Sequence, residues 1–348
     1  MKILILGASY GSLLSTKLLM AGHDATLICR DKTAALINAE GTVVRLKLRD
    51  EPDHREIRSA DLPGKLNAVT PENGRPEDYD IVGLAMQEPQ YSAPAVRALM
   101  GRVAASGKPC LSIMNMPPLP FLRRIKELSG APLKSCYDDP SVWDGFVPGL
   151  MSLCSPDPQA FRPPECAANV LHVSLPTNFK AVEFEDREHN AMLARLETDI
   201  DNVRLDGKDV PVKLRIFESL FVPMAKWSML LTGNYRCVLP DREQAISDAV
   251  HGDLEASKAV YAWVDELVRT LGADSADQVP FEKYAKAAES LLQPSSAARG
   301  IGSGVSKIER VDRLVQLIGA QVGMHNETVD RTVAAVDARL AANMQAAK

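Results

Sequence analysis

The sequence lacks the long apolar run that a membrane-spanning helix needs, since no stretch approaches about 18 consecutive apolar residues. It also lacks an excess of basic charge: 40 lysines and arginines stand against 45 aspartates and glutamates, for a net charge of −5. A nucleic-acid-binding domain would gather basic residues on one face. We therefore expect neither a membrane protein nor a nucleic-acid binder.

Spacings typical of metal sites and redox-active thiols are missing as well. The six cysteines contain no C-x-x-C pair, and the six histidines contain no H-E-x-x-H motif. The apolar run at the N-terminus is short and ends in a glycine, so it does not have the form of a secretory signal. These absences predict a cytoplasmic protein with reduced thiols and no metal site.

The first half of the chain alternates short apolar runs with helical patterns. We expect strands at residues 2–6, 24–29, 78–86 and 107–115, with helices at 12–20 and 93–106. Such an alternation predicts a parallel sheet covered on both faces. A Pro-rich stretch at 145–167 reads as a loop-rich insertion, and after it we expect strands at 169–176 and 180–185 and a helix at 188–201.

The second half has a different pattern. From Leu214 onward the apolar residues follow the period of helices, and strand signals are essentially gone. We expect helices at 215–231, 245–271, 281–292, 311–323 and 329–345. Because 348 residues exceed the usual size of one domain, this change predicts an α/β domain at 1–208 and an all-helical domain at 209–348.

The turn after the first expected strand is half of a dinucleotide-binding motif. Such a turn, G-x-G-x-x-G, brings backbone N–H groups and a helix N-terminus close to a pyrophosphate. Here residues 7–12 read GASYGS, so glycines remain at two places and serines replace the others. Gly7, Ser9, Tyr10 and Gly11 are our candidates for contact with the cofactor. The alternative is a purely structural strand-turn-helix.

Arg30 stands at the end of the second expected strand. A nicotinamide cofactor without the 2′-phosphate usually meets an Asp or Glu at this position. A guanidinium instead suits a 2′-phosphate, through bidentate charge-assisted hydrogen bonds. Arg30 therefore favours NADP over NAD, although Asp31 directly follows it and a solvated surface charge is the alternative interpretation.

Two further stretches complete the pattern. In CLSIMNMPP (110–118) a strand ends near Asn115, and in VPMAKWSMLLTGNY (222–235) a helix carries Lys226 in an apolar setting. This arrangement resembles the ketopantoate reductase (2-dehydropantoate 2-reductase) family. The resemblance implies a Rossmann domain and a helical domain like the C-terminal domain of 6-phosphogluconate dehydrogenase, with NADPH and substrate in the cleft between them.

The resemblance also implies roles for single residues. Gly7 and Gly11 match the phosphate turn, Arg30 matches the arginine for the NADP phosphate, and Asn115 matches the asparagine beside the nicotinamide and substrate. Lys226 matches a general acid that protonates the carbonyl oxygen as hydride arrives. The remaining candidates are Met86 and Gln87 for the cofactor, and Asn234, Ser295 and Ser296 for the substrate.

Several positions depart from the family pattern. Leu230 stands where the family has an asparagine, Ala85-Met86-Gln87 stands where it has a lysine, and Lys307 falls near its late acidic residue, two positions before Glu309. Losing polar partners changes which substrate is favoured, so we expect a substrate other than ketopantoate. The Pro-rich stretch, with Trp143, Phe146 and Phe161, would suit a lid or pocket wall, or a surface loop.

The residues around Lys226 support its role independently. Helical spacing surrounds it with apolar side chains: Phe221, Met224, Met229 and Leu231. Burial there would lower the pKa of the lysine toward neutrality, which suits proton transfer. The alternative is a lysine that extends its ammonium group to solvent from a core helix.

These observations predict an NADPH-dependent reductase of a 2-oxo acid or related carbonyl compound, and the helical domain could support a homodimer. A first alternative is an opine or hydroxyacid type of dehydrogenase, for which His251 or His325 would be the acid/base. A second alternative is a nucleotide-binding protein without catalytic activity, in which the altered turn reflects lost function.

Overall fold

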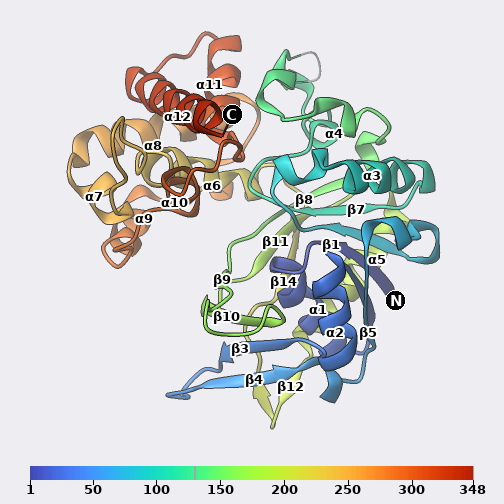
Figure 1. Cartoon of the computed structure of the whole chain (residues 1–348). Coiled ribbons are helices and arrows are strands. Elements are labelled where there is room, and N and C mark those ends of the chain that lie inside the picture. Colours follow the sequence, from blue (N-terminus) through green and yellow to red (C-terminus); the bar gives the residue numbers. More distant parts are fainter. Residues whose placement is uncertain (129–130, 348) are drawn as a thin grey trace. The chain divides into compact units, whose positions relative to one another are not determined.

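The computed structural model describes residues 1–128 and 131–347. The chain folds into two compact units (Figure 1). The first unit comprises Met1–Met86, Gln90–Arg124 and Ser141–Glu218, and the second comprises Gln87–Pro89, Ile125–Pro140 and Ser219–Lys348. The expected domain boundary between residues 208 and 209 stays a prediction.

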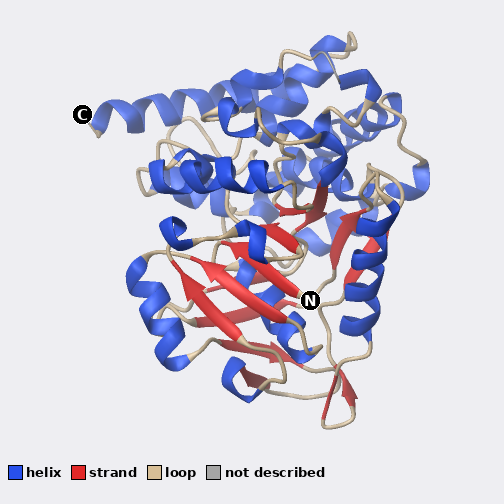
Figure 2. Ribbon diagram, turned by 90° about the vertical axis from the view of Figure 1, so that its right-hand side faces the viewer, coloured by secondary structure: helices blue, strands red, loops and turns tan. Residues whose placement is uncertain are grey.

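A sheet of eight strands forms the centre of the first unit (Figure 2). Its members are β1 (Lys2–Leu6), β2 (Asp24–Ile28), β5 (Leu66–Val69), β6 (Ile81–Leu84), β7 (Cys110–Ile113), β8 (Met151–Ser155), β11 (Phe179–Val182) and β14 (Leu214–Phe217). Their order is β14-β11-β8-β7-β6-β1-β2-β5. All neighbours from β5 to β8 pair in parallel, β11 is antiparallel to β8, and β14 is parallel to β11.

The strand order reverses direction next to β1. From β1 the chain passes through helix α1 (Tyr10–Met20) to β2 on one side, whereas β6 pairs with the other side of β1. In open parallel sheets, ligands bind at such a switch point, outside the carboxyl ends of the strands. The segments that follow β1, β2, β6 and β7 therefore share one edge of the sheet.

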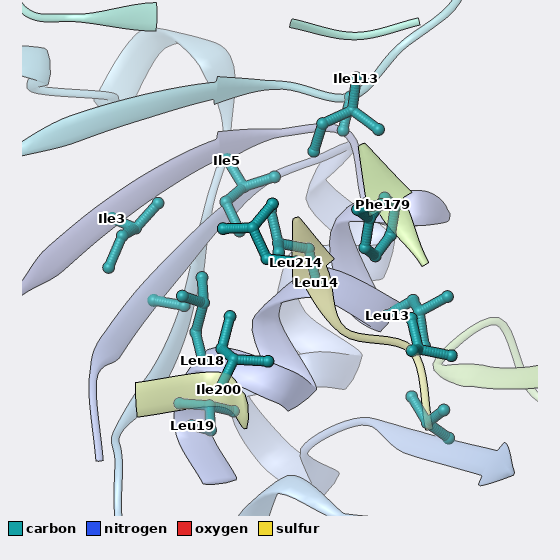
Figure 3. Close-up of a cluster of buried hydrophobic side chains, with 14 of the residues drawn as sticks. Ile3, Ile5, Leu13, Leu14, Leu18, Leu19, Ile113, Phe179, Ile200 and Leu214 are labelled. Carbon is teal, nitrogen blue, oxygen red and sulfur yellow. The ribbon is translucent and has the colours of Figure 1, made fainter. Parts of the chain in front are cut away.

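Helix α1 is buried around most of its circumference. Its leucines, Leu13, Leu14, Leu18 and Leu19, are at most 3% exposed and belong to the same core cluster as Ile3 and Ile5 of β1 (Figure 3). Burying each leucine contributes about 1.5–3 kcal/mol to stability. A helix with apolar residues on all sides must be covered on more than one face.

A second sheet supplies part of that cover. Its strands are β3 (Val43–Lys47), β4 (His54–Arg58), β9 (Gln159–Phe161) and β10 (Val170–Leu175), in the order β4-β3-β10-β9. Val44 and Leu171 of this sheet join the core cluster of α1. Lys17 of α1 is also buried, and its Nζ donates to the carbonyl oxygens of Val210 (3.2 Å) and Pro211 (3.0 Å). Burial lowers the pKa of Lys17 to about 7.

The other elements of the first unit are mostly helical. Local signals define their ends: Pro94 begins α3, and Gly107 follows it in a left-handed conformation. Asp186 caps α5 by accepting hydrogen bonds from the N–H groups of Glu188 and His189. These elements are α2 (Asp31–Glu40), α3 (Pro94–Ser106), α4 (Leu119–Leu122), α5 (Arg187–Asp201) and the hairpin of β12 (Arg204–Leu205) and β13 (Lys208–Asp209).

The second unit is built from helices in its described part. They are α6 (Lys226–Met229), α7 (Ile246–His251), α8 (Leu254–Thr270), α9 (Phe281–Ala288), α10 (Ser296–Gly302), α11 (Val311–Gln321) and α12 (Glu327–Ala346). The continuous helix expected at 245–271 is wrong. Asp253 ends it, because its side chain accepts a hydrogen bond from Ala256 N–H and starts α8 as a separate helix. Among the described helices, each is too short or too polar to cross a membrane.

The structure confirms the predicted fold class, a largely parallel sheet followed by a helical part, and corrects it in two places. Leu214–Phe217 is a strand and not the start of a helix. The helical spacing of Leu214, Phe217 and Phe221 led to the wrong prediction, because the strand is held by pairing with β11, which is distant in the sequence. The Pro-rich stretch contains β8, whose five residues are all buried in the main sheet. The flanking prolines had indicated a loop there.

Candidate cofactor and substrate residues

Gly7 follows β1 in a conformation that only glycine adopts readily. Its φ is +103°, and its N–H donates to the carbonyl oxygen of Ile28 at 3.0 Å. A Cβ atom on Gly7 would lie 2.6 Å from the carbonyl oxygen of Ala85, at the end of β6. Gly7 therefore lets the chain turn tightly where β1 and β6 run side by side.

Gly11 has the other steric role of the turn. It lies in the first turn of α1, and a Cβ atom there would be 2.9 Å from Cγ2 of Ile5. Close packing of helix on strand is the task of the last glycine in a dinucleotide-binding turn. Ser9 is the N-cap of α1, but its exposed side chain makes no capping hydrogen bond. The N-terminus of α1 therefore has N–H groups that a phosphate could satisfy.

Arg30 lies two residues beyond β2, at the same edge of the sheet. It is exposed and is the N-cap residue of α2. Within the described chain its guanidinium forms no ion pair with a carboxylate, Asp31 included. Its charge is therefore available to an anionic ligand.

The segments after β6 and β7 bring two more candidates to this edge. Met86 donates its N–H to the hydroxyl oxygen of Tyr91 at 3.1 Å, and its Cγ would be 2.7 Å from a Cβ on Gly7. Asn115 is half-buried, two residues beyond β7. The structure thus gathers Gly7, Gly11 and Met86 around the turn. Gln87 follows Met86 in the chain, but it belongs to the second unit.

Lys226 is the first residue of α6 and is half-buried, next to the buried Trp227. The helix changes character after one turn: Leu230–Asn234 is a π-helix, in which the N–H of Tyr235 donates to the carbonyl oxygen of Leu230 at 3.0 Å. Short π-helical segments occur frequently at functional sites. Lys226 thus precedes this π-helical segment, and Asn234 is its last residue.

Asn234 and Ser295 lie together in the second unit. Ser295 Oγ donates to the carbonyl oxygen of Asn234 at 2.7 Å and accepts from Ala298 N–H at 3.1 Å, so it also caps α10. Ser295 is only 2% exposed, whereas Ser296 is exposed. The hydroxyl of Ser295 therefore has a structural use, and the substrate roles of Asn234, Ser295 and Ser296 stay predictions.

The histidines of the alternative hydroxyacid-dehydrogenase interpretation lie at the surface. His251 ends α7, and its Nε2 is 3.0 Å from the carbonyl oxygen of Ala285. His325 is exposed in the loop between α11 and α12. A catalytic histidine is usually held by surrounding groups at a site that excludes water, and neither position has that character. The role of Lys226 as the acid stays a prediction.

The aromatic residues of the Pro-rich region and its flank are not a common pocket wall. Trp143 is fully buried, with its ring centroid 5.3 Å from that of Tyr91 and 5.8 Å from that of Phe146. Phe146 is buried as well, whereas Phe161 is 49% exposed. Trp143 and Phe146 therefore belong to the core, and a lid that uses them is ruled out by their packing.

Two charged residues near the candidate positions were missed from the sequence. The first is Arg162, directly after β9, whose Nη2 donates to the carbonyl oxygen of Ala8 in the glycine turn at 2.8 Å. The second is Glu88 in the second unit, which is 2% exposed. Both Glu88 carboxylate oxygens accept from Asp138 N–H at 3.2 Å, and Glu88 N–H donates to Glu309 Oε1 at 3.3 Å. No local sequence signal marks either residue, because their partners are far along the chain.

Glu88 makes the stability of the protein depend on pH. Burial raises its pKa to about 7 from an ordinary value of 4.5, so the folded chain binds a proton that the unfolded chain releases. The free energy of unfolding is therefore expected to fall as pH rises from about 4.5 to about 7. Replacing Glu88 with glutamine removes this loss and should raise the free energy of unfolding at about pH 8 by about 1–3 kcal/mol.

Urea unfolding at about pH 5 and about pH 8 measures this effect. Glu266→Gln is the matched control, because Glu266 is a glutamate on the solvent side of α8 in the same unit. We expect the control to keep the pH dependence of the wild type. A Glu88→Gln variant with the same pH dependence as the wild type would show that Glu88 is not the titrating group.

No family model matches the chain, and no curated protein matches it in sequence. Solved structures do match it over nearly its full length. A protein assigned as a ketopantoate reductase from Ralstonia solanacearum MolK2 has a TM-score of 0.68 at 16% identity, over 98% of each chain. A D-mandelate dehydrogenase with NADH and anilino(oxo)acetate has a TM-score of 0.67 at 14% identity, over 99% of each chain.

A 2-dehydropantoate 2-reductase from Methylococcus capsulatus has a TM-score of 0.63 at 11% identity, over 96% of this chain and 95% of that one. At such low identities these likenesses establish the fold and leave substrate and cofactor open. The likeness agrees with the resemblance seen in the sequence. The chain has the fold of the ketopantoate reductases, as a divergent sequence.

Proposed function

We propose that the protein is an NADPH-dependent reductase of a 2-oxo acid or related carbonyl compound. The observation that carries this proposal is the turn after β1, where Gly7 and Gly11 are both sterically required and α1 presents an N-terminus without a side-chain cap. The ketopantoate reductase and D-mandelate dehydrogenase structures with the same fold support it. Both are named for reactions that interconvert a carbonyl and a CH–OH group.

The residues at the carboxyl edge of the main sheet fit a dinucleotide. The turn and the N-terminus of α1 would hold the pyrophosphate, and Arg30 would hold a phosphate on the adenosine ribose. The bound nicotinamide supplies the hydride, which is the chemistry of the cofactor. The protein contributes orientation, the exclusion of water and a proton.

Lys226 is the proposed source of that proton. As hydride reaches a carbonyl carbon, negative charge develops on the oxygen, and an ammonium group can neutralise it by donating a proton. Asn115 is proposed to orient the carbonyl and the nicotinamide through its amide. Asn234, Ser295 and Ser296 are the proposed substrate contacts, and the exposed Ser296 has the hydroxyl that is better placed to reach a ligand.

The proposed preference for NADPH rests on Arg30. The D-mandelate dehydrogenase of this fold was solved with NADH, the cofactor without the 2′-phosphate. Titration of the protein with NADPH and with NADH, followed by fluorescence, tests this preference. We expect tighter binding of NADPH, and a loss of about 10- to 100-fold in NADPH affinity for Arg30→Ala. NADH affinity should stay within about twofold. If neither cofactor binds to the wild type, the reductase proposal is wrong.

The substrate is expected to be less polar than ketopantoate. Leu230 is buried on the helix of Lys226, where the family pattern has an asparagine. A panel of ketopantoate, branched aliphatic and aromatic 2-oxo acids, assayed by NADPH oxidation, would identify the class. In the hydroxyacid-dehydrogenase alternative, an exposed histidine is the acid/base. That alternative predicts that the Lys226→Ala variant remains active. Tight NADPH binding without any turnover would favour the non-catalytic alternative.

We also propose a homodimer. A ketopantoate reductase from Staphylococcus aureus described as dimeric has the same fold, with a TM-score of 0.62 at 7% identity. In this chain, Leu254, Leu292, Val305 and Met344 of the second unit are large apolar residues that are exposed. Sedimentation of the purified protein determines its mass in solution.

A further inference from the structure

Two arginines from distant parts of the chain interact electrostatically near the end of β2. Arg30 follows that strand, and Arg162 follows β9 in the second sheet. Arg162 is half-buried, and its Nη2 donates to the carbonyl oxygen of Ala8, which lies between Gly7 and Ser9 in the glycine turn. The hydrogen bond uses one of the five N–H groups of the guanidinium, so the others remain for a ligand.

The charges around Arg162 favour an anionic ligand. The ionisable groups that act on it are Cys29 and Arg30, and the positive charge of Arg30 adds to burial in lowering the pKa of Arg162. Both arginines act in turn on the thiol of Cys29, whose pKa is raised by burial. Neither guanidinium forms an ion pair with a carboxylate among the residues that the structure describes.

Two positive charges held close together without a carboxylate repel each other, more so where one of them is partly buried. The hydrogen bond to the carbonyl oxygen of Ala8 fixes the position of Arg162 at the glycine turn. An anion between the two guanidiniums would remove the repulsion. It would also form charge-assisted hydrogen bonds to both, the strongest class of hydrogen bond in proteins.

We propose that Arg162 is a second phosphate-binding residue, which together with Arg30 holds the 2′-phosphate of NADPH. The proposal rests on the proposed function, because it names a further residue for the same cofactor. Arg162 contacts Ala8, whose neighbour Gly7 donates to Ile28 at the end of β2. The 2′-phosphate is favoured over the pyrophosphate because Arg162 also interacts with Arg30, at the strand end where the adenosine ribose binds. The pyrophosphate is served by the N-terminus of α1.

Binding of NADPH, NADH and 2′-AMP to three variants tests the proposal. Arg162→Gln keeps a donor for Ala8 but removes the charge, and Arg162→Lys keeps the charge but removes the planar fork. Arg187→Gln is the matched control. Arg187 is exposed in the first turn of α5, which follows β11. Because β11 runs antiparallel to β8, the carboxyl end of β11 lies at the sheet edge opposite to that of Arg30.

We expect Arg162→Gln to weaken NADPH and 2′-AMP by about 10-fold or more and NADH by less than about twofold. Arg162→Lys should lose part of this affinity, and Arg187→Gln none. Unchanged NADPH affinity in Arg162→Gln, or an equal loss for NADPH and NADH, would overturn the proposal. Thermal unfolding of each variant shows whether the fold is intact, and Arg162→Lys carries the test if Arg162→Gln is unstable.

The outcomes separate this inference from the proposed function. If the wild type binds 2′-AMP through Arg162 but does not bind NADPH, the reductase proposal is contradicted and the proposed phosphate site is supported. A wild type that binds NADPH with no contribution from Arg162 would keep the reductase and overturn the site. A wild type that binds neither NADPH nor 2′-AMP would overturn both.

Discussion

Replacing Lys226 with alanine is expected to lower kcat by about 10²- to 10⁴-fold on whichever 2-oxo acid the protein reduces. The physical reason is that the variant lacks the proposed proton donor, so the negative charge that develops on the carbonyl oxygen as hydride arrives is not neutralised by it. The affinity for NADPH should stay within about twofold, because Lys226 is not among the proposed cofactor contacts, which apart from Gln87 are in the first unit. Steady-state kinetics and a separate NADPH titration measure the two effects.

Two further variants make the result specific to proton donation. Lys226→Arg keeps the positive charge, but its pKa is too high to release a proton near neutral pH, so it should stay as slow as alanine. Lys258→Ala is the matched control, because Lys258 is an exposed lysine in α8 of the same unit. An arginine variant with nearly full activity would mean that Lys226 acts only through its charge. Full activity in Lys226→Ala would remove it from the mechanism.

Replacing Gly7 with alanine is expected to lower the free energy of unfolding by about 2–4 kcal/mol. Part of the loss is the conformational strain of a residue with a side chain at a φ of +103°. The rest comes from the new Cβ atom, 2.6 Å from the carbonyl oxygen of Ala85, which forces β1 and the end of β6 apart. Urea unfolding measures the loss, and NADPH affinity should fall in the same variant.

Gly101→Ala is the contrasting change. Gly101 lies inside α3, and no heavy atom is within 4 Å of a Cβ placed there. Alanine is the better helix former, so this variant should be more stable by about 0.5–1 kcal/mol. If Gly7→Ala were as stable as the wild type, the tight approach of β1 and β6 could not be correct.

The parts of the fold that were predictable from the sequence are those with local signals. The leucines of α1 recur at helical spacing, and β1 and β2 are apolar runs that polar or small residues bound. The strand β14 has no such signal, because its four residues are held by pairing with β11, some 35 residues earlier: Phe179 faces Leu214 in the register. Trp143, just before the Pro-rich stretch, would have suited a lid or pocket wall and is instead core.

The candidate site divides in the same way. The positions of Gly7, Gly11 and Arg30 in the fold were predictable, because a strand-turn-helix-strand unit has a regular spacing along the chain. Their contacts with a cofactor stay predictions. Arg162 was not predictable, because it reaches the turn from 154 positions away. Glu88 was not either, since its partners Asp138 and Glu309 are 50 and 221 positions distant. Only the folded chain brings such groups together.

The division of the chain has a consequence for anyone who wishes to study its halves. The boundary is crossed after residues 86, 89, 124, 140 and 218, so the second unit takes two short pieces from the first half of the sequence. One of them, Ile125–Pro140, contributes the buried side chains of Leu133 and Cys136. A gene fragment that starts at Ser219 would therefore encode helices without part of their own interior. Each unit is made of segments that are not continuous in the sequence, so no single cut in the gene yields two complete units.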